Sequence, residues 1–164
     1  MKFLINIFVV FALGLGFVSC SNDDDEVFVD PTLDVNYANM AGTWRLSEWN
    51  GEKMDGDTRY YYITLDRFEN GGTYRYEIYT NLNSFVSEHI TGTYQLGETE
   101  DMKPTISGTF DYTLTGDDAW LYDYLITELY ETSVKWTATD DAEEVRVYTR
   151  CSEVPADIVN GIQF

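Results

Sequence analysis

Thiols and an imidazole are the most reactive side chains of this chain, and it has few of them. The sequence contains two cysteines, Cys20 and Cys151, and a single histidine, His89. A zinc site built here would need carboxylates for nearly all its ligands, whereas zinc in proteins favours cysteine and histidine. We therefore expect no metal site, and we interpret His89 as a solvent-facing residue of a strand.

The sequence also lacks the motifs of the common catalytic centres. It has no Gly-x-Ser-x-Gly elbow, no phosphate-binding loop and no His-Glu-x-x-His. Acidic residues cluster at Asp117-Asp118 and Asp55-Gly56-Asp57, but neither cluster has the ligand spacing of an EF-hand. Such clusters in turns are usually solvated, so we expect a protein that is not an enzyme and needs no cofactor.

Cys20 closes an N-terminal segment with the pattern of an export signal. Lys2 precedes an apolar run from Phe3 to Phe17, and the small Ser19 stands directly before Cys20. A retained transmembrane anchor is the alternative interpretation. The run is interrupted by polar and glycine residues and is shorter than the roughly 20 apolar residues that span a bilayer, which favours the export signal.

The residues Phe17 to Cys20 resemble the lipobox of bacterial lipoproteins. In that family the signal is cut before the cysteine, which then carries diacylglycerol and an N-acyl chain such as palmitate. The resemblance implies that residues 1–19 are removed and that Cys20 is the site of lipidation. Three acyl chains are enough for stable anchoring. An acylated Cys20 leaves Cys151 without a disulfide partner, and we expect Cys151 to be a buried structural thiol.

An acidic run follows the lipidation site, over residues 21–26. It resembles the signal that sends lipoproteins of one group of Gram-negative bacteria to the outer face of the outer membrane. The run is also typical of a solvated tether, because like charges repel one another and keep the chain extended. The two interpretations are compatible. We predict a flexible tether over residues 20–33 and an outer-membrane, cell-surface location, with the leaflet left open.

The charge balance restricts the partners. The chain has 10 Lys and Arg against 29 Asp and Glu, a formal net charge of −19. Such a surface repels nucleic acid and anionic headgroups, so we expect no nucleic-acid partner and contact with the membrane only through the lipid on Cys20. About 130 residues remain after the tether, which is enough for one domain with its own core.

Apolar and polar residues alternate along eight segments. The pattern is complete between Ile106 and Leu114, where one face carries Ile106, Gly108, Phe110, Tyr112 and Leu114. Similar alternation occurs at Trp44 and Leu46, Tyr61 to Leu65, Tyr74 to Ile78, Ile90 to Leu96, Trp120 to Tyr124, Val134 and Trp136, and Val145 and Val147. Turn residues such as Asn50-Gly51 separate the segments, which indicates an antiparallel all-β meander. Periodicity alone leaves a closed barrel and a two-sheet sandwich open.

Two elements resemble the lipocalins. Gly42-Thr43-Trp44 is similar to the Gly-x-Trp at the start of that fold, and Arg150 stands where the family keeps an arginine that packs across the tryptophan. Tyr122-Asp123-Tyr124 loosely resembles the family's Thr-Asp-Tyr, without the threonine. The resemblance implies an eight-stranded up-and-down barrel over residues 34–154. It also implies a helical turn at Asn36–Met40 that plugs the base. At the other end, residues 155–160 followed by Gly161 suit a short helix, and we expect the segment 155–164 to pack on the outer wall of the barrel through Ile158, Val159, Ile162 and Phe164.

The inner face predicted from the alternation is rich in tyrosine. Candidate ligand-binding residues are Tyr74, Tyr76, Tyr94, Tyr112, Trp120, Tyr122 and Tyr124. Buried phenols need hydrogen-bond partners, so we expect a partly polar interior. Gly92 and Gly108 would either allow bends or leave room for a ligand. A filled barrel and an open calyx are both compatible with eight strands.

Two functions remain open at this point. The first is a lipid-anchored, lipocalin-like binding protein that holds a small amphipathic or aromatic molecule. The second is a non-catalytic surface protein with a filled barrel, which binds a glycan or a protein through exposed aromatic residues such as Trp49, Tyr60 and Tyr62.

Overall fold

The computed structural model describes residues 31–161 apart from 57, 84–85 and 113–118. The expected signal (1–19), Cys20, most of the tether and the Asp117-Asp118 pair lie outside the described residues, as do Ile162 and Phe164. Within the described part, Leu33 is already tied to the domain, because its N–H donates to the Leu129 carbonyl at 2.7 Å. The domain therefore includes a residue that we expected in the tether.

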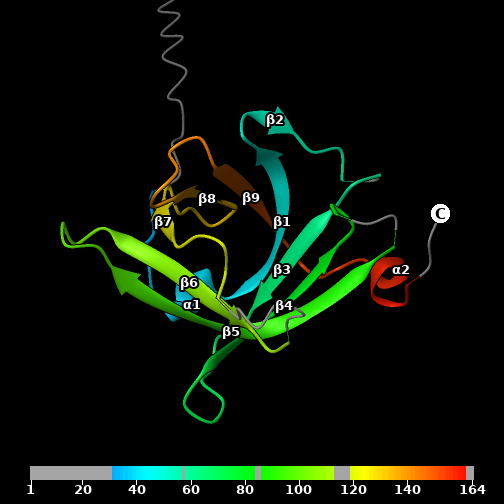
Figure 1. The fold of residues 1–164 in the computed structure, drawn as a ribbon, viewed down its shortest axis with the longest axis horizontal. Helices are drawn as coiled ribbons and strands as arrows, with labels where there is room; N and C mark the ends of the chain where they lie inside the picture. The colour runs from blue at the N-terminus through cyan, green and yellow to red at the C-terminus, as the bar shows by residue number, and fades with distance from the viewer. Residues whose placement is uncertain (1–30, 57, 84–85, 113–118, 162–164) are drawn as a thin grey trace, which may run out of the picture.

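The described chain is all-β with two short helices (Figure 1). The strands are β1 (Gly42–Trp49), β2 (Glu52–Lys53), β3 (Tyr61–Leu65), β4 (Tyr74–Thr80), β5 (Glu88–Glu98), β6 (Pro104–Phe110), β7 (Tyr124–Thr127), β8 (Ser133–Ala138) and β9 (Val145–Cys151). The helices are α1 (Tyr37–Met40) and α2 (Ala156–Val159).

Eight of these strands form a closed antiparallel barrel. β1 and β3 to β9 follow one another in sequence order, and β9 pairs back onto β1. This closing pair confirms the predicted up-and-down barrel over a sandwich, because a sandwich would leave β1 and β9 in separate sheets. The extra strand, β2, pairs only with the end of β1 after the predicted turn, where Asn50 and Gly51 have φ of 52° and 83°.

The base of the barrel is plugged by α1, as the sequence indicated. Asn36 caps this turn by accepting a hydrogen bond from the Asn39 N–H, and Met40 is fully buried at its end. The Trp44 indole N–H donates to the Met40 carbonyl at 2.8 Å, which ties the plug to β1. Above this base the core consists of apolar and aromatic side chains from the strands that face inward.

β9 presents the opposite face from the one expected. Tyr148 is fully buried and stands across from Val134, whereas Val145 and Val147 are only partly buried. Alternation then places Arg146 and Arg150 on the inner face with Tyr148. The expectation that the two valines mark the inner face is wrong, because aromatic rings at both ends of the barrel accept the arginines.

A bulge in β1 reverses the direction of Trp49. Leu46 pairs with Tyr148, but Glu48 pairs with Val147, so one extra residue is inserted at Ser47. A bulge shifts the alternation by one residue. Trp49 thus comes to lie opposite Arg146 on the inner side, although strict alternation from Trp44 predicted an exposed residue.

The wall is weakest between β6 and β7. Only two residue pairs join these strands, and β7 begins at Tyr124 rather than at the expected Trp120. Trp120 instead lies beside β6, where its backbone N–H donates to the Gly108 carbonyl at 2.8 Å. β6 ends at Phe110, and Tyr112 is 78% exposed, so its predicted inward position is wrong.

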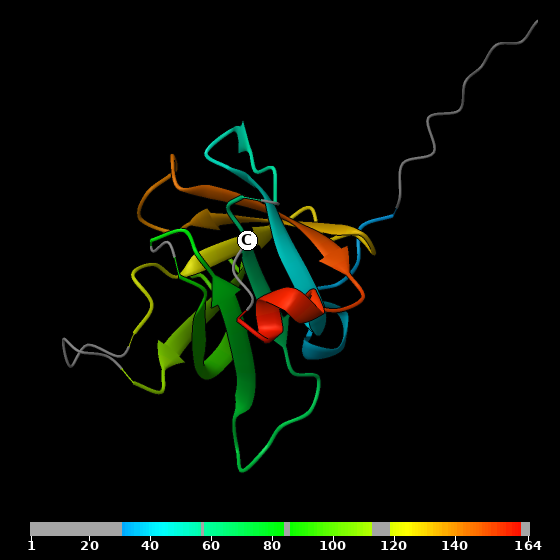
Figure 2. The ribbon, with the colours of Figure 1, turned by 90° about the vertical axis from the view of Figure 1, so that its right-hand side faces the viewer.

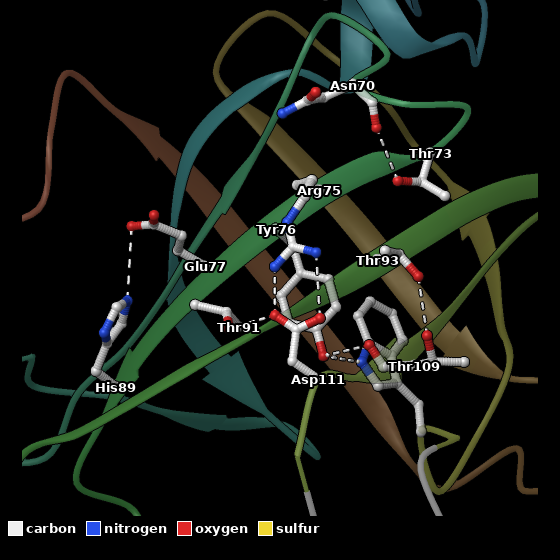
Figure 3. A network of polar contacts seen from close by, with 11 residues as sticks. Asn70, Thr73, Arg75, Tyr76, Glu77, His89, Thr91, Thr93, Thr109 and Asp111 are labelled. Atoms are coloured by element: carbon white, nitrogen blue, oxygen red, sulfur yellow. Dashed lines mark hydrogen bonds and ion pairs between the residues drawn. The ribbon is translucent and has the colours of Figure 1, made fainter.

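The outer surface is polar over β4 to β6. Figure 3 shows Arg75 paired with Asp111, which also accepts a hydrogen bond from Thr91, and Thr93 bonded to Thr109. His89 is exposed on β5 as predicted and stacks on Tyr79, with ring centroids 4.4 Å apart.

The C-terminal helix lies outside the barrel (Figure 2), where its Asp157 is close enough to Tyr62 of β3 to affect that residue's pKa. Tyr62 points outward but is only 6% exposed, and its pKa is raised, chiefly by burial. Cys151 is half-buried at the end of β9, where its thiol donates to the Thr43 carbonyl at 3.6 Å. Burial raises the pKa of this thiol.

A candidate ligand pocket at the open end of the barrel

One end of the barrel is closed by Arg150. Its guanidinium lies over the Trp44 ring, 3.9 Å from the centroid, and its three nitrogens donate to backbone carbonyls. The acceptors are Glu131 for Nε at 2.8 Å, Ala41 for Nη1 at 2.6 Å and Asn39 for Nη2 at 2.6 Å. Each of the three nitrogens of this cation therefore has an acceptor from the protein's own backbone.

The lower interior is filled by the protein's own tyrosines. Tyr94 donates to the Asp66 carbonyl at 2.6 Å, and Tyr76 donates to the Thr109 carbonyl at 3.1 Å while accepting the Trp120 indole N–H at 2.9 Å. These two buried phenols therefore have partners within the barrel, as polar groups in an interior require. Burial raises the pKa of Tyr76 to about 12.

The two mid-strand glycines make room for these side chains and not for a ligand. A Cβ on Gly92 would lie 2.5 Å from the Tyr76 hydroxyl oxygen, and one on Gly108 would lie 2.2 Å from the Trp120 ring. Both distances are far below van der Waals contact. The space that glycine leaves in β5 and β6 is thus occupied by Tyr76 and Trp120.

The upper interior contains a pocket of about 250 Å³ at the end opposite α1, here called the mouth pocket. Leu121, which is 83% exposed, lies at its rim, so the pocket reaches the surface. Six aromatic side chains and one arginine form much of its lining: Trp49, Tyr61, Phe110, Trp120, Tyr124, Trp136 and Arg146. The remaining lining residues are aliphatic or uncharged polar: Leu46, Ile78, Thr80, Leu82, Asn83, Ile90 and Leu121. The barrel is therefore filled below and open above.

Six of the seven candidate ligand-binding residues lie at or near the interior, and the seventh, Tyr112, is exposed. Only Trp120 and Tyr124 line the mouth pocket. Tyr76 and Tyr94 are buried below it, and Tyr74 and Tyr122 are half-buried against the core. Tyr74 stacks on Tyr37 of the plug, with centroids 3.5 Å apart.

Arg146 is the one charged side chain in the wall of the mouth pocket, among the described residues. Its guanidinium carbon lies 5.1 Å from the Tyr124 ring centroid, 5.5 Å from that of Trp49 and 5.9 Å from that of Tyr61. These distances are within cation–π range. Burial disfavours the charge, but the groups around Arg146 outweigh burial, so its pKa is raised and it stays a cation.

Glu144 holds one edge of this cation. Its Oε1 accepts from Arg146 Nε at 2.7 Å, and its Oε2 accepts from Trp49 Nε1 at 2.9 Å and from Asn50 Nδ2 at 3.4 Å. Burial alone would raise the carboxyl pKa, but the hydrogen bonds and the arginine charge hold the pKa of Glu144 below its usual value. The carboxylate is thus ionised at neutral pH and both its oxygens are used.

Two polar atoms next to this cation are buried without a partner among the described residues. They are the indole nitrogen of Trp136 and the hydroxyl of Tyr148, whose rings are in contact with centroids 4.6 Å apart. Arg146 and Tyr61 lie near enough to affect the pKa of Tyr148, which burial raises, but neither has hydrogen-bond geometry with its hydroxyl. Unpartnered buried groups are rare and costly, so this part of the wall is a candidate for polar recognition.

A second hollow of about 490 Å³ lies along β4 to β6 and is bordered by Tyr37, Tyr74, Thr93 and Asp123. It is shallower and more polar than the mouth pocket. Within the described residues neither of the buried, unpartnered polar atoms belongs to its lining. The mouth pocket is therefore the better candidate site.

The sequence reasoning missed the residues that matter most in the mouth pocket. Arg146 was overlooked because Val145 and Val147 suggested the other face of β9, and Trp49 was placed outside because alternation does not reveal the bulge. The interaction surface proposed from Trp49, Tyr60 and Tyr62 is also wrong in its membership. Trp49 lines the pocket, Tyr60 is half-buried and Tyr62 is buried.

Within the described part of the chain, the acidic, histidine and cysteine side chains form no group of three that could bind a metal ion. No helix in that part is long and apolar enough to cross a membrane. Comparison with protein-family models, with curated proteins and with solved structures gives no match to this chain.

Proposed function

We propose that this protein is a lipid-anchored, lipocalin-like binding protein that holds a small amphipathic or aromatic molecule in its mouth pocket and does no chemistry on it. The observation that carries the proposal is a pocket of about 250 Å³ inside a closed barrel, walled by six aromatic residues and open at its rim. Concave, mostly apolar sites with a few polar groups are the usual form of small-molecule sites.

The position of the pocket also supports this function. The base is sealed by Met40, Trp44 and Arg150, so a ligand would enter from one end only. Six rings supply a large apolar surface, and Arg146 supplies one polar contact. A pocket of this size is larger than the roughly 150 Å³ cavity that takes benzene and smaller than typical drug-sized sites of about 300–1,000 Å³. The ligand is therefore a molecule of one or two rings.

The anchor completes the proposal. Cys20 would be acylated, and the acidic run at residues 21–26 would direct the protein to the outer membrane and its outer surface. The roughly 12 residues between Cys20 and the domain, extended at about 3.3 Å each, would hold the barrel as far as about 40 Å from the bilayer. A binding protein held in this way could capture a molecule next to the membrane without releasing itself from the cell.

The test is a ligand screen with the purified protein. One- and two-ring aromatic compounds of either charge and of no charge are screened by thermal shift, and positives are measured by native mass spectrometry. Binding of at least one class should quench the tryptophan fluorescence of the protein, because Trp49, Trp120 and Trp136 line the pocket.

A variant blocks the pocket without touching its polar groups. Leu121→Trp at the rim should weaken binding, because the larger ring obstructs entry. Met102→Trp is the matched control, since Met102 is equally exposed and does not line the pocket. Failure of every compound in the screen, or equal binding by Leu121→Trp and native protein, would reject the mouth pocket as a ligand site.

A further inference from the structure

The two inward-facing arginines of β9 have different hydrogen-bond arrangements. They are four residues apart on the same face, so about 13 Å separates them along the strand. Arg150 at the base donates from all three nitrogens to backbone carbonyls. Arg146 at the mouth makes one hydrogen bond of good geometry among the described residues, from Nε to Glu144. Its guanidinium also interacts with the Tyr148 hydroxyl, but that contact lies outside hydrogen-bond geometry, so Nη1 and Nη2 have no strong acceptor.

The unused nitrogens of Arg146 are the ones that suit a planar anion. A guanidinium has five N–H donors in a rigid fork, and its two terminal nitrogens match the spacing of two carboxylate oxygens. Glu144 occupies only the Nε side, and its own oxygens are taken by Trp49 and Asn50 as well. A second acceptor can therefore approach the terminal nitrogens without displacing Glu144.

A second observation also indicates that the wall around Arg146 suits an anion. Trp136 lies directly opposite Arg146 on β8, lines the mouth pocket and has a buried indole N–H without a partner among the described residues. This group can only donate. Together with the terminal nitrogens of Arg146, this wall therefore has more donors than acceptors, even counting the Tyr148 hydroxyl, and an anion on Arg146 suits such a wall.

We propose that the mouth pocket binds a small aromatic carboxylate, with its ring among the aromatic side chains and its carboxylate on the terminal nitrogens of Arg146. This inference rests on the proposed function, which requires only that the pocket hold a small molecule. It adds the chemical class of the ligand. A cationic ligand is excluded by the same geometry, because the cation site between Trp49, Tyr61 and Tyr124 is already filled by Arg146.

The acidic exterior of the protein does not prevent this binding. The net charge of −19 repels an anion at long range, but salt screens charges beyond about 8 Å at physiological ionic strength. Among the described residues that line the pocket Arg146 is the one charged side chain, since Glu144 contacts its Nε but does not line the pocket. The contact of Arg146 with a carboxylate is strengthened by the apolar walls.

The experiment compares three ligands of nearly the same shape. The purified full-length protein is titrated by calorimetry with 2-naphthoate, with the uncharged 2-naphthamide and with the cationic 2-naphthylmethylamine. We expect 2-naphthoate to bind at least about tenfold more tightly than the amide, the amount that one charged hydrogen-bonded contact supplies, and the amine to bind most weakly.

Variants then identify the residue responsible. The double variant Arg146→Met with Glu144→Gln removes the cation and its partner together, so that no buried charge is left alone. We expect this double variant to bind 2-naphthoate and 2-naphthamide with equal affinity. Arg146→Lys keeps the charge but loses the planar fork, so it should keep only part of the preference for 2-naphthoate over 2-naphthamide. Lys135→Met is the control, because this exposed lysine on the outside of β8 carries the same charge and does not line the pocket.

The outcomes separate this inference from the proposed function. Equal affinity for 2-naphthoate and 2-naphthamide in the native protein overturns the inference and leaves the proposed function standing. A preference that survives in the double variant also overturns it, because the carboxylate would then bind elsewhere. No binding of any of the three ligands at millimolar concentration overturns it as well, and circular dichroism establishes that each variant is folded.

Discussion

Arg150 and Trp44 close the barrel by stacking across the β1–β9 pair, with 3.9 Å between the guanidinium carbon and the ring centroid. The two residues are also Cα partners in that pair. Gly42, two residues before Trp44, has φ of 119°, and a Cβ there would lie 2.7 Å from Arg150 Nη1. The arginine, the tryptophan and the glycine therefore form one packing unit at the point where the chain closes on itself.

Replacing Arg150 should destabilise the whole barrel. Arg150→Met loses the cation–π contact and leaves the carbonyls of Asn39, Ala41 and Glu131 without this donor. We expect the free energy of unfolding to fall by about 2–4 kcal/mol. Urea unfolding followed by tryptophan fluorescence measures it. Lys103→Met removes a positive charge from an exposed loop and should change stability by less than about 0.5 kcal/mol. Equal effects of the two variants would show that Arg150 is not a closing residue.

Gly108→Ala should be strongly destabilising because of Trp120. The added methyl group would lie 2.2 Å from the indole ring, so the ring must leave its place and lose its hydrogen bond to Tyr76. We expect a loss of about 1–3 kcal/mol in thermal or urea unfolding. Gly97→Ala is the control in β5, where the nearest atom is the Thr105 hydroxyl at 3.2 Å.

A smaller partner should rescue the Gly108 variant. In Gly108→Ala with Trp120→Leu, the methyl group has room, so the two changes together should cost less than the sum of each alone. Additive losses would mean that Trp120 does not occupy the space over Gly108.

Stability should depend on the ionisation of Glu144. Its pKa is lower in the folded protein than the 4.5 of a free glutamate, so its ionised form stabilises the fold. That contribution is complete above about pH 4.5 and is lost as the pH falls through the lower, folded pKa. The difference in unfolding free energy between native protein and Glu144→Gln should therefore be largest near pH 6 and should shrink by pH 3.

The comparison with Glu144→Gln isolates one group among many acids. The protein has 29 acidic residues, and their common titration affects both proteins alike. Glu100→Gln, an exposed acid, serves as the control and should show a difference near zero at every pH. A difference in unfolding free energy between native protein and Glu144→Gln that stays constant from pH 6 to pH 3 would contradict the lowered pKa.

Cys20→Ser should release the protein from the membrane. Without the thiol no lipid is attached, so labelling with palmitate should disappear and the protein should move to the soluble fraction. Replacing the acids of residues 23–26 with their amides should keep the label but abolish digestion by protease added to intact cells. Amide substitution of four exposed acids of the domain, Glu69, Glu98, Glu100 and Asp101, is the charge-matched control. Persistence of surface digestion in the first variant would reject the acidic run as a sorting signal.

The strand segments were predictable from the sequence because the pattern that defines them is local. Alternation from Ile106 to Phe110 and the Asn50-Gly51 turn each depend on neighbouring residues, and both have the expected structure. The inward tyrosines Tyr76 and Tyr94 follow from the same period of two. The base could be foreseen only because Gly42, Trp44 and Arg150 resemble a known arrangement.

The mouth pocket depended on tertiary structure. A one-residue bulge at Ser47 turns Trp49 inward. No local sequence pattern predicts this bulge, because it depends on the pairing of β1 with β9, about 100 residues away. Tyr112 leaves the inner face because β6 ends at Phe110, where the wall opens toward β7. Each of these differences changes which side chains reach the pocket.

By itself the sequence determined the alternating strands, the acidic surface and the pattern at Cys20, because each depends only on the order of neighbouring residues. Tertiary structure decided which face of β9 is inside. Val145 and Val147 suit the interior by hydrophobicity, but only the closed barrel brings Trp49, Tyr61 and Tyr124 around Arg146 and Glu144 against its Nε. A buried cation is stable only with such partners, and the three rings, which come from three distant strands, surround Arg146 only after the barrel has closed.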